Sequence, residues 1–288
     1  MKMATLYHYC STSTFHAIVA TKSIRLSSLS LSNDTMEGKL VADTITRLAK
    51  KDQLDVQSLT KLQQSVAFFE SIFDGLGFCL SEASDLLSQW RGYAADATGV
   101  SIGFSCEYFE CLGRQPHPGF ASPFSVKKVH YDAAQHEIEI DPTYCEIKKL
   151  IAEGAFRPPG IIASAIRTAN ENESSRAKRK ELSFDVDKKL LSLLPVLFLL
   201  KSSAFREEQE WRLLTHLIRG GNDDCEYHPL ANRLVPFRKV NLIELERLPI
   251  VEIVLAPKHL TPYRDIADCL MRFGFGKAPI RCSEASYR

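Results

Sequence analysis

The most informative pattern in the chain lies in the stretch Arg206-Glu207-Glu208-Gln209-Glu210-Trp211-Arg212-Leu213-Leu214, which we read as a β-strand. Because side chains alternate along a strand, one face would present Glu208, Glu210 and Arg212. The other face would present Gln209, Trp211 and Leu213, and its apolar bulk predicts packing into a core. The charged face is typical either of a site held on a rigid element or of a sheet edge in water. An exposed ion pair on such an edge would contribute only about 0–1 kcal/mol.

Strand-like segments gather toward both ends of the chain. Short apolar or alternating runs predict strands at 6–9, 24–27, 76–81, 99–104, 124–131, 233–237, 250–256 and 280–283. Helical patterns occur at 12–21, after residue 34, at 54–72, from 85 to about 92 and at 262–273. The block from about 142 to 203 also reads as helical, with a kink expected at Pro195. We therefore expect one α+β domain over 1–288, in which helices flank a mixed or antiparallel central sheet and a helical insertion at about 142–203 precedes the late strands.

The composition is that of an ordinary globular protein. A formal net charge of +1 provides no global field for nucleic acid or an anionic membrane, so any such binding would need a local patch. The N-terminus lacks the apolar core of a signal peptide, and the most apolar window, 190–200, is far shorter than the roughly 20 residues that span a bilayer. We expect a cytoplasmic protein without membrane association.

The cysteines and histidines do not predict a metal site. Eight cysteines stand singly, without a CxxC pair, and several lie in apolar runs where a thiol behaves as a small hydrophobe. Cys225 precedes His228 by three residues, but no second pair completes a tetrahedral set. No Walker loop, GxGxxG, HExxH or GxSxG motif is present. We expect neither a disulfide framework nor a bound metal.

Several side chains admit both a structural and a functional interpretation. His8, between Tyr7 and Tyr9, is more typical of a packed core histidine than of a catalytic one. The run Asn33-Asp34-Thr35-Met36-Glu37 has the spacing of a capping box, which gives Asp34 and Glu37 a structural role at a helix start.

The segment Ser88-Gln89-Trp90-Arg91-Gly92-Tyr93 raises the same choice. Trp90 shares a helix face with apolar residues and can belong to the core, whereas Tyr93, just past a glycine, is better placed to line a cleft. The basic run 176–180 is most simply a solvated helix start, with a nucleic-acid patch as the alternative.

A set of motifs follows in order along nearly the whole chain: Leu6-Tyr7-His8-Tyr9, Asn33-Asp34-x-x-Glu37, Phe78-Cys79-Leu80-Ser81, Gln89-Trp90-Arg91-Gly92-Tyr93, Gly99-Val100-Ser101-Ile102-Gly103-Phe104, Glu208-Gln209-Glu210-Trp211-Arg212 and Ile253-Val254-Leu255-Ala256-Pro257-Lys258. This order resembles a bacterial family, domain-of-unknown-function family 2971. Such a resemblance implies a shared fold but no activity.

A weaker resemblance concerns chemistry. A histidine on the first strand, an aromatic-rich middle and a late strand glutamate look like the His-Tyr-Glu pattern of ADP-ribosyltransferases. The resemblance implies catalytic roles for Glu210, Glu208 and His8, and NAD as the cofactor. It implies NAD binding by His8, Tyr93, Arg212, Trp90 and Ser81. Glu210 would stabilise an oxocarbenium-like transition state, and Glu208 would help to activate an acceptor.

Three functions therefore stay open. The first is an NAD-dependent ADP-ribosyltransferase-like enzyme, such as a toxin or phage-defence effector that acts on a protein or nucleic acid. The second is a non-catalytic sensor or interaction module that binds a nucleotide, another small anion or a partner through Arg212 and Arg91. The third is a nucleic-acid-acting defence protein that uses the basic run at 176–180. Convergence of His8, Tyr93 and Glu210 on one pocket would favour the first.

Overall fold

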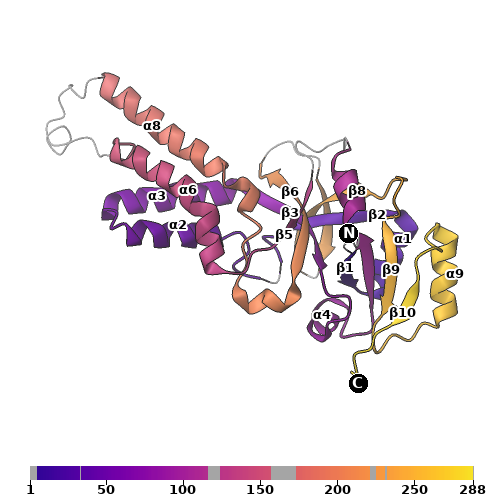
Figure 1. Cartoon of the computed structure of the whole chain (residues 1–288). Coiled ribbons are helices and arrows are strands. Elements are labelled where there is room, and N and C mark those ends of the chain that lie inside the picture. Colours follow the sequence, from indigo (N-terminus) through magenta and orange to yellow (C-terminus); the bar gives the residue numbers. More distant parts are fainter. Residues whose placement is uncertain are drawn as a thin grey trace.

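A computed structural model of the chain describes residues 5–32, 34–115, 124–156, 173–220, 225–230 and 232–287. Asn33 and part of the expected helical insertion lie outside these ranges. The expected α+β class is confirmed, since helices flank a ten-stranded sheet (Figure 1). Among the described strands, only β9 and β10 pair in parallel; all other strand pairs are antiparallel.

One half of the sheet runs in the order β10-β9-β4-β1. Its strands are β1 (Thr5–Cys10), β4 (Val100–Ser105), β9 (Ile250–Leu255) and β10 (Ile280–Cys282). Three helices, α1 (Thr12–Thr21), α5 (Cys106–Gly113) and α9 (Tyr263–Phe273), contribute apolar residues to the same core cluster as these strands. The sequence had indicated every one of these elements except α5.

The other half of the sheet is built around β3 (Phe73–Ser81). One edge of β3 pairs along its whole length with β6 (Glu210–Ile218), which in turn pairs with β5 (Ser125–Lys128). The other edge leads to β2 (Ser23–Ser28), then to β8 (Arg233–Asn241) and β7 (Glu226–Leu230). The sequence pattern had not indicated β7.

The two halves meet at an incomplete junction on β3. Strand β1 pairs with β3 only through Tyr7 and Ser81, while β2 pairs with it only at Gly77 and Leu76. Among the described residues, no strand therefore pairs with this edge of β3 at positions 78–80. The sheet has a local gap there, and backbone groups on that edge must find other partners.

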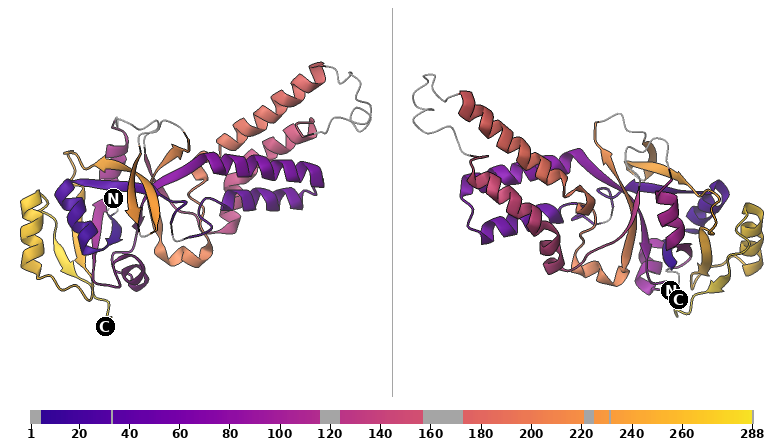
Figure 2. Two further views of the ribbon diagram at one scale, coloured as in Figure 1. Left: turned by 180° about the vertical axis from the view of Figure 1, so that it is seen from behind. Right: turned by 45° about the horizontal axis from the view of Figure 1, so that its top comes forward.

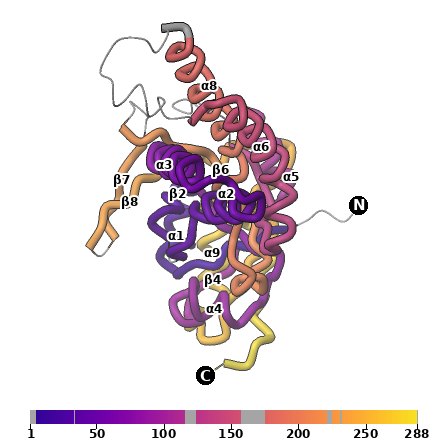
Figure 3. Tube along the Cα trace, turned by 90° about the vertical axis from the view of Figure 1, so that its left-hand side faces the viewer, coloured from indigo at the N-terminus to yellow at the C-terminus, as the bar shows by residue number. Residues whose placement is uncertain are grey.

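The remaining long helices form a bundle at one end of the sheet (Figure 2). It consists of α2 (Leu40–Lys51), α3 (Val56–Ile72), α6 (Ala133–Ala152) and α8 (Glu173–Leu191), which lie together in Figure 3. These helices share a separate apolar core. The expected insertion at 142–203 is thus only part of this unit. Its helices begin earlier, at Ala133, and two of the four come from the first quarter of the chain.

Two local predictions about this bundle are wrong. Pro195 does not kink a helix, because α8 ends at Leu191 and the proline lies in a separate 3-10 turn, η1 (Leu194–Val196). The capping box at Asp34 and Glu37 does not form either, since α2 begins at Leu40. Asp34 instead accepts a hydrogen bond from the Met36 amide at 2.9 Å within a turn. Among the described helices, none is long and apolar enough to cross a membrane.

Candidate functional site

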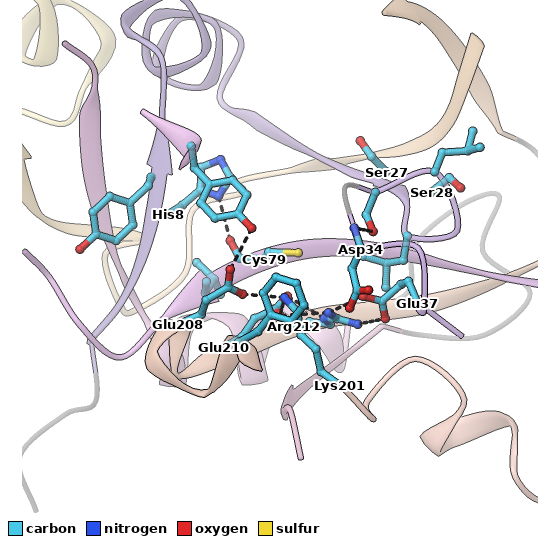
Figure 4. A pocket seen from close by; sticks show the side chains of 18 of the residues that line it. His8, Ser27, Ser28, Asp34, Glu37, Cys79, Lys201, Glu208, Glu210 and Arg212 are labelled. Carbon is cyan, nitrogen blue, oxygen red and sulfur yellow. Dashed lines mark hydrogen bonds and ion pairs between the residues drawn. The ribbon is translucent and has the colours of Figure 1, made fainter. Parts of the chain in front are cut away.

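A pocket of about 330 Å³ opens beside the gap in the sheet. Its volume falls at the lower end of the range for small-molecule sites. Five of the residues singled out from the sequence line it: His8, Tyr93, Glu208, Glu210 and Arg212. They come from three separate parts of the chain, and four of them are labelled in Figure 4.

The charged face of β6 is buried, so it is not a sheet edge in water. Arg212 is 1% exposed and Glu210 is 4% exposed, whereas Trp211 on the opposite face is only partly buried. The indole of Trp211 donates to Glu82 at 2.8 Å, while Leu213 beside it is fully buried. Of the two interpretations of the charged face, the exposed sheet edge is therefore wrong. The predicted packing of the opposite face holds fully for Leu213 and in part for Trp211.

Arg212 uses all five of its N–H donors within the protein. Its Nε and Nη2 donate to the two oxygens of Glu210, at 2.7 and 3.0 Å. Its Nη1 and Nη2 donate to the two oxygens of Glu37, and Nη1 also donates to the Phe198 carbonyl at 2.7 Å. A fully occupied guanidinium cannot bind a ligand anion without giving up a partner. Arg212 is therefore best described as the residue that holds both carboxylates in place.

Glu37 completes this arrangement from a distant part of the chain. Its side chain is buried and reaches Arg212 instead of a helix end. Burial raises the pKa of Glu37, and the Arg212 charge opposes that rise. Acceptance by both carboxylate oxygens from one guanidinium is the geometry of an ionised pair. The capping pattern in the sequence concealed this role.

Lys201 connects the two carboxylates that precede Arg212. Its Nζ lies 2.6 Å from Glu208 and 2.8 Å from Glu210, and its side chain is 6% exposed. Burial alone would lower the pKa of Lys201, but the two carboxylates outweigh it and raise that pKa. Burial would likewise raise the pKa of Glu210, but Arg212 and Lys201 bring it down to about 2. Glu210 is therefore ionised throughout the neutral range.

The cluster carries a surplus of negative charge. Three carboxylates meet two cations, which leaves one excess negative charge beside the pocket. Glu208 is the least enclosed of these carboxylates, with 12% side-chain exposure. A charge surplus in a poorly solvated place favours a ligand group that is, or becomes, positive.

Glu208 does not lie on the β-strand that the sequence pattern predicts for it. It ends a 3-10 helix, η2 (Ser203–Glu208), and Gln209 then adopts the left-handed conformation at φ 46° before β6 begins. Ser81 fixes the turn, because its hydroxyl donates to the Glu208 carbonyl at 2.7 Å. Ser81 is buried and does not line the pocket, so it positions Glu208 and makes no contact with the cavity.

His8 provides a hydrogen-bond partner for a backbone carbonyl on the edge of β3 that the gap in the sheet leaves unpaired. Its Nδ1 lies 2.8 Å from the Cys79 carbonyl, and because a carbonyl can only accept, Nδ1 carries the proton. The ring stacks on Phe78 with centroids 4.0 Å apart. Burial lowers the pKa of His8 to about 4, against the opposing effect of the carbonyl. At neutral pH the ring is uncharged, and its Nε2 is an acceptor with no described partner.

Tyr93 and Cys79 form further parts of the pocket wall. Tyr93 is 43% exposed, and its hydroxyl donates to Glu208 at 2.9 Å. Cys79 pairs with Arg212 across the β3–β6 ladder and is exposed at the pocket it lines. Desolvation at the pocket wall raises the pKa of the Cys79 thiol well above its usual value, and the negative charge of Glu210 adds to that rise. The thiol is therefore a neutral group.

Trp90 does not reach the pocket. It is fully buried, packs against Tyr9 with centroids 4.7 Å apart, and donates from Nε1 to Asp85 at 2.6 Å. Asp85 also accepts from the Ser283 hydroxyl at 2.6 Å. Trp90 therefore anchors α4 (Leu87–Tyr93), the helix that presents Tyr93, and the ligand-binding role predicted for it has no support in the geometry.

Lys201, Glu37 and Cys79 were missed as site residues by reasoning from the sequence. Lys201 did leave a signal, because it is the first charge after the apolar window 190–200 and lies seven and nine residues before two glutamates. Cys79 left none beyond its place in a strand. Only the fold brings it to Glu210.

Comparison with known proteins matches part of the chain to a family model whose description names no activity. Residues 89–213 match the family model described as "Protein of unknown function (DUF2971)". The matched range contains Tyr93, Lys201, Glu208, Glu210 and Arg212, whereas His8 and Glu37 lie outside it. No curated protein and no solved structure matches the chain. The resemblance seen in the motifs is confirmed over residues 89–213.

Proposed function

We propose that the pocket binds NAD and that the protein is an ADP-ribosyltransferase-like enzyme. The observation that carries the proposal is the convergence of His8, Tyr93, Glu208 and Glu210 on one cavity, with both carboxylates held by fixed cations. Such a site is poised for charge that develops during a reaction, because its dipoles and charges need no rearrangement. Arg212 and Lys201, which bind these carboxylates, are themselves buried, and this keeps the geometry of the site rigid.

The proposed reaction breaks the bond between the ribose C1′ and the nicotinamide nitrogen. Nicotinamide leaves as a neutral base with the bonding electron pair, and positive charge develops on the ribosyl carbon. The surplus negative charge around Glu208 and Glu210 would stabilise that cation. An acceptor nucleophile then forms a bond to C1′ and releases its proton. Glu208 is the better receiver of that proton, since Glu210 is bound by both Arg212 and Lys201.

His8 and Tyr93 would hold the substrate on this side of the pocket. The free Nε2 of a neutral His8 accepts a hydrogen bond, which suits a ribose hydroxyl. The exposed ring of Tyr93 offers a stacking surface for nicotinamide, and its hydroxyl is fixed by Glu208. Aromatic stacking and one directed hydrogen bond together orient the scissile bond.

The two alternative functions have less support. A sensor that binds anions through Arg212 and Arg91 would need arginines free to do so, yet Arg212 is fully occupied and Arg91 lies over the Tyr287 ring outside the pocket. The basic run at 176–180 lies on α8 in the bundle (Figure 1), and none of its residues lines the pocket. We propose that the enzyme acts in the cytoplasm as a toxin or phage-defence effector, with a protein or nucleic acid as acceptor.

The test is NAD consumption by the purified full chain. Glu210→Gln removes one charge and keeps the shape, so we expect NAD consumption to fall at least about 100-fold. Glu82→Gln is the matched control, because Glu82 is a partly exposed carboxylate outside the pocket and should leave consumption unchanged. Circular dichroism would establish that both variants are folded. Absence of NAD binding and consumption by the unaltered chain, supplied with cell extract as a source of acceptors, would refute the proposal.

A further inference from the structure

The pocket has a second end that the proposed chemistry does not use. In Figure 4, His8 and Glu208 lie toward one side of the cavity, while Ser27, Ser28 and Asp34 lie toward the other. The β7–β8 hairpin adds four residues to the lining: His228, Leu230, Arg233 and Val235. The cavity thus extends from the acidic cluster on β6 toward β2 and the hairpin.

Strand register places the hairpin residues on the same face as Ser27. Ser27 pairs with Phe237, and Val235 and Arg233 follow at intervals of two along β8. Across the hairpin, Leu230 pairs with Arg233 and His228 pairs with Val235, so these side chains share that face. Arg25, two residues before Ser27, lies over the Phe237 ring at 4.6 Å. Arg25, Arg233 and Lys239 outweigh Glu226, which leaves this face basic.

Arg233 differs from every other cation that lines the pocket. Lys201 and Arg212 are buried and bound to carboxylates, whereas Arg233 is exposed and has no hydrogen bond or ion pair within the described residues. A guanidinium presents a planar fork of donors that matches phosphate oxygens. Its position at the lining of the cavity therefore provides an unoccupied anion-binding group.

Asp34 provides a complementary acceptor at the same end. Its Oδ1 is taken up by the Met36 amide, but its Oδ2 is buried and has no hydrogen-bond partner among the described residues. A buried acceptor without a donor is costly, and a ligand hydroxyl would satisfy it. Ser27 lies on the same side and adds a hydroxyl to the lining.

We infer that this end of the pocket is a pyrophosphate-and-sugar subsite, in which Arg233 contacts the phosphates and Asp34 accepts from a ribose hydroxyl. The inference rests on the proposed function, since it assigns the second half of a dinucleotide. The two ends then match the two charges of NAD: the cationic nicotinamide riboside lies at the acidic cluster, and the anionic pyrophosphate lies at the basic face. Specificity for a dinucleotide over a nucleoside would arise at Arg233.

Calorimetric titration of the full chain separates the two halves of the ligand. The probes are NAD, inorganic pyrophosphate and nicotinamide riboside, which lacks the pyrophosphate. Arg233→Gln should weaken binding of NAD and of pyrophosphate about tenfold and reduce their salt dependence, because one charge-assisted contact is lost. Binding of nicotinamide riboside should stay within about twofold of the unaltered protein. Arg264→Gln, at an exposed arginine on α9 outside the pocket, is the matched control and should change none of the three.

The outcomes distinguish this inference from the proposed enzyme. If pyrophosphate binding depends on Arg233 but no nicotinamide is released, the subsite is supported and the proposed reaction is refuted. No pyrophosphate binding by the unaltered chain would overturn the subsite. Equal weakening of NAD and nicotinamide riboside by Arg233→Gln would also overturn it, as would an unchanged affinity for pyrophosphate.

Discussion

Two arginines on opposite sides of one pocket show how differently a guanidinium can be used. Arg212 is 1% exposed and donates to two carboxylates and a carbonyl, whereas Arg233 is exposed and makes no described ion pair. A buried charge is tolerated only when protein groups satisfy it, so Arg212 is committed to the structure. An exposed charge has no such requirement and stays available to a ligand. Within this pocket, proximity to the cavity alone therefore does not identify a binding residue.

The largest expected loss of stability comes from replacing Arg212, the buried arginine. Arg212→Leu leaves Glu37 and Glu210 buried without their principal partner, and breaking a buried pair in this way costs about 3–5 kcal/mol. Urea denaturation followed by circular dichroism would measure the loss in the free energy of unfolding. Arg233→Leu is the matched comparison and should change it by no more than about 0.5 kcal/mol. Similar losses in the two variants would contradict the distinction between the arginines.

A second prediction concerns pH and His8. The unfolded chain binds a proton at His8 near pH 6.5, but the folded protein does so only near pH 4. Stability is therefore lost as the pH falls from about 6.5 toward 4, and is restored above 6.5. Because the His8 ring is partly exposed at the pocket, the shift corresponds to at most about 3 kcal/mol.

His8→Gln removes the group that binds this proton, so the pH profile of the free energy of unfolding should become flatter over that range. The difference between the two profiles isolates His8 from the carboxylates that titrate in the same region. Identical slopes in the variant and the unaltered protein between pH 4 and 6.5 would show that His8 is not held neutral by the fold.

The sequence allowed most of the sheet to be predicted because its strands are apolar or alternate with a period of two. Segments such as Ile250–Leu255 carry that pattern plainly. The strand Glu226–Leu230 could not be found in this way, since its residues are largely exposed and no apolar alternation marks it. The bundle was only half predicted, because its pairing of early and late helices depends on contacts between distant segments.

The candidate site could be predicted only in part for a related reason. The glutamates and Arg212 stand together in the sequence, and His8 and Tyr93 stand out by residue type. The depth of Glu210 could not be read from alternation, which gives the face of a strand but not what covers it. Glu37 has the spacing of a helix cap, and its tertiary contact with Arg212 overrides that local pattern.

A third, smaller effect is expected at Tyr93. Tyr93→Phe removes the hydroxyl that donates to Glu208 but keeps the aromatic ring at the pocket wall. A single hydrogen bond of this kind contributes about 0.5–1.5 kcal/mol, so thermal unfolding should show only a modest loss of stability. NAD binding should persist because the stacking surface remains. If NAD binding were abolished in Tyr93→Phe and preserved in Tyr93→Leu, the stacking role would be wrong.

The most direct test of the central claim is the release of nicotinamide from NAD, measured by proton NMR with Glu208→Gln. Glu208 is the least enclosed carboxylate of the cluster, so this substitution removes the charge with the least risk to folding. We predict that the unaltered chain, supplied with cell extract as a source of acceptors, releases nicotinamide and that Glu208→Gln does so at least about 100-fold more slowly, with Glu82→Gln unaffected. Equal rates in Glu208→Gln and in the unaltered chain, or no release from any of them, would contradict the account.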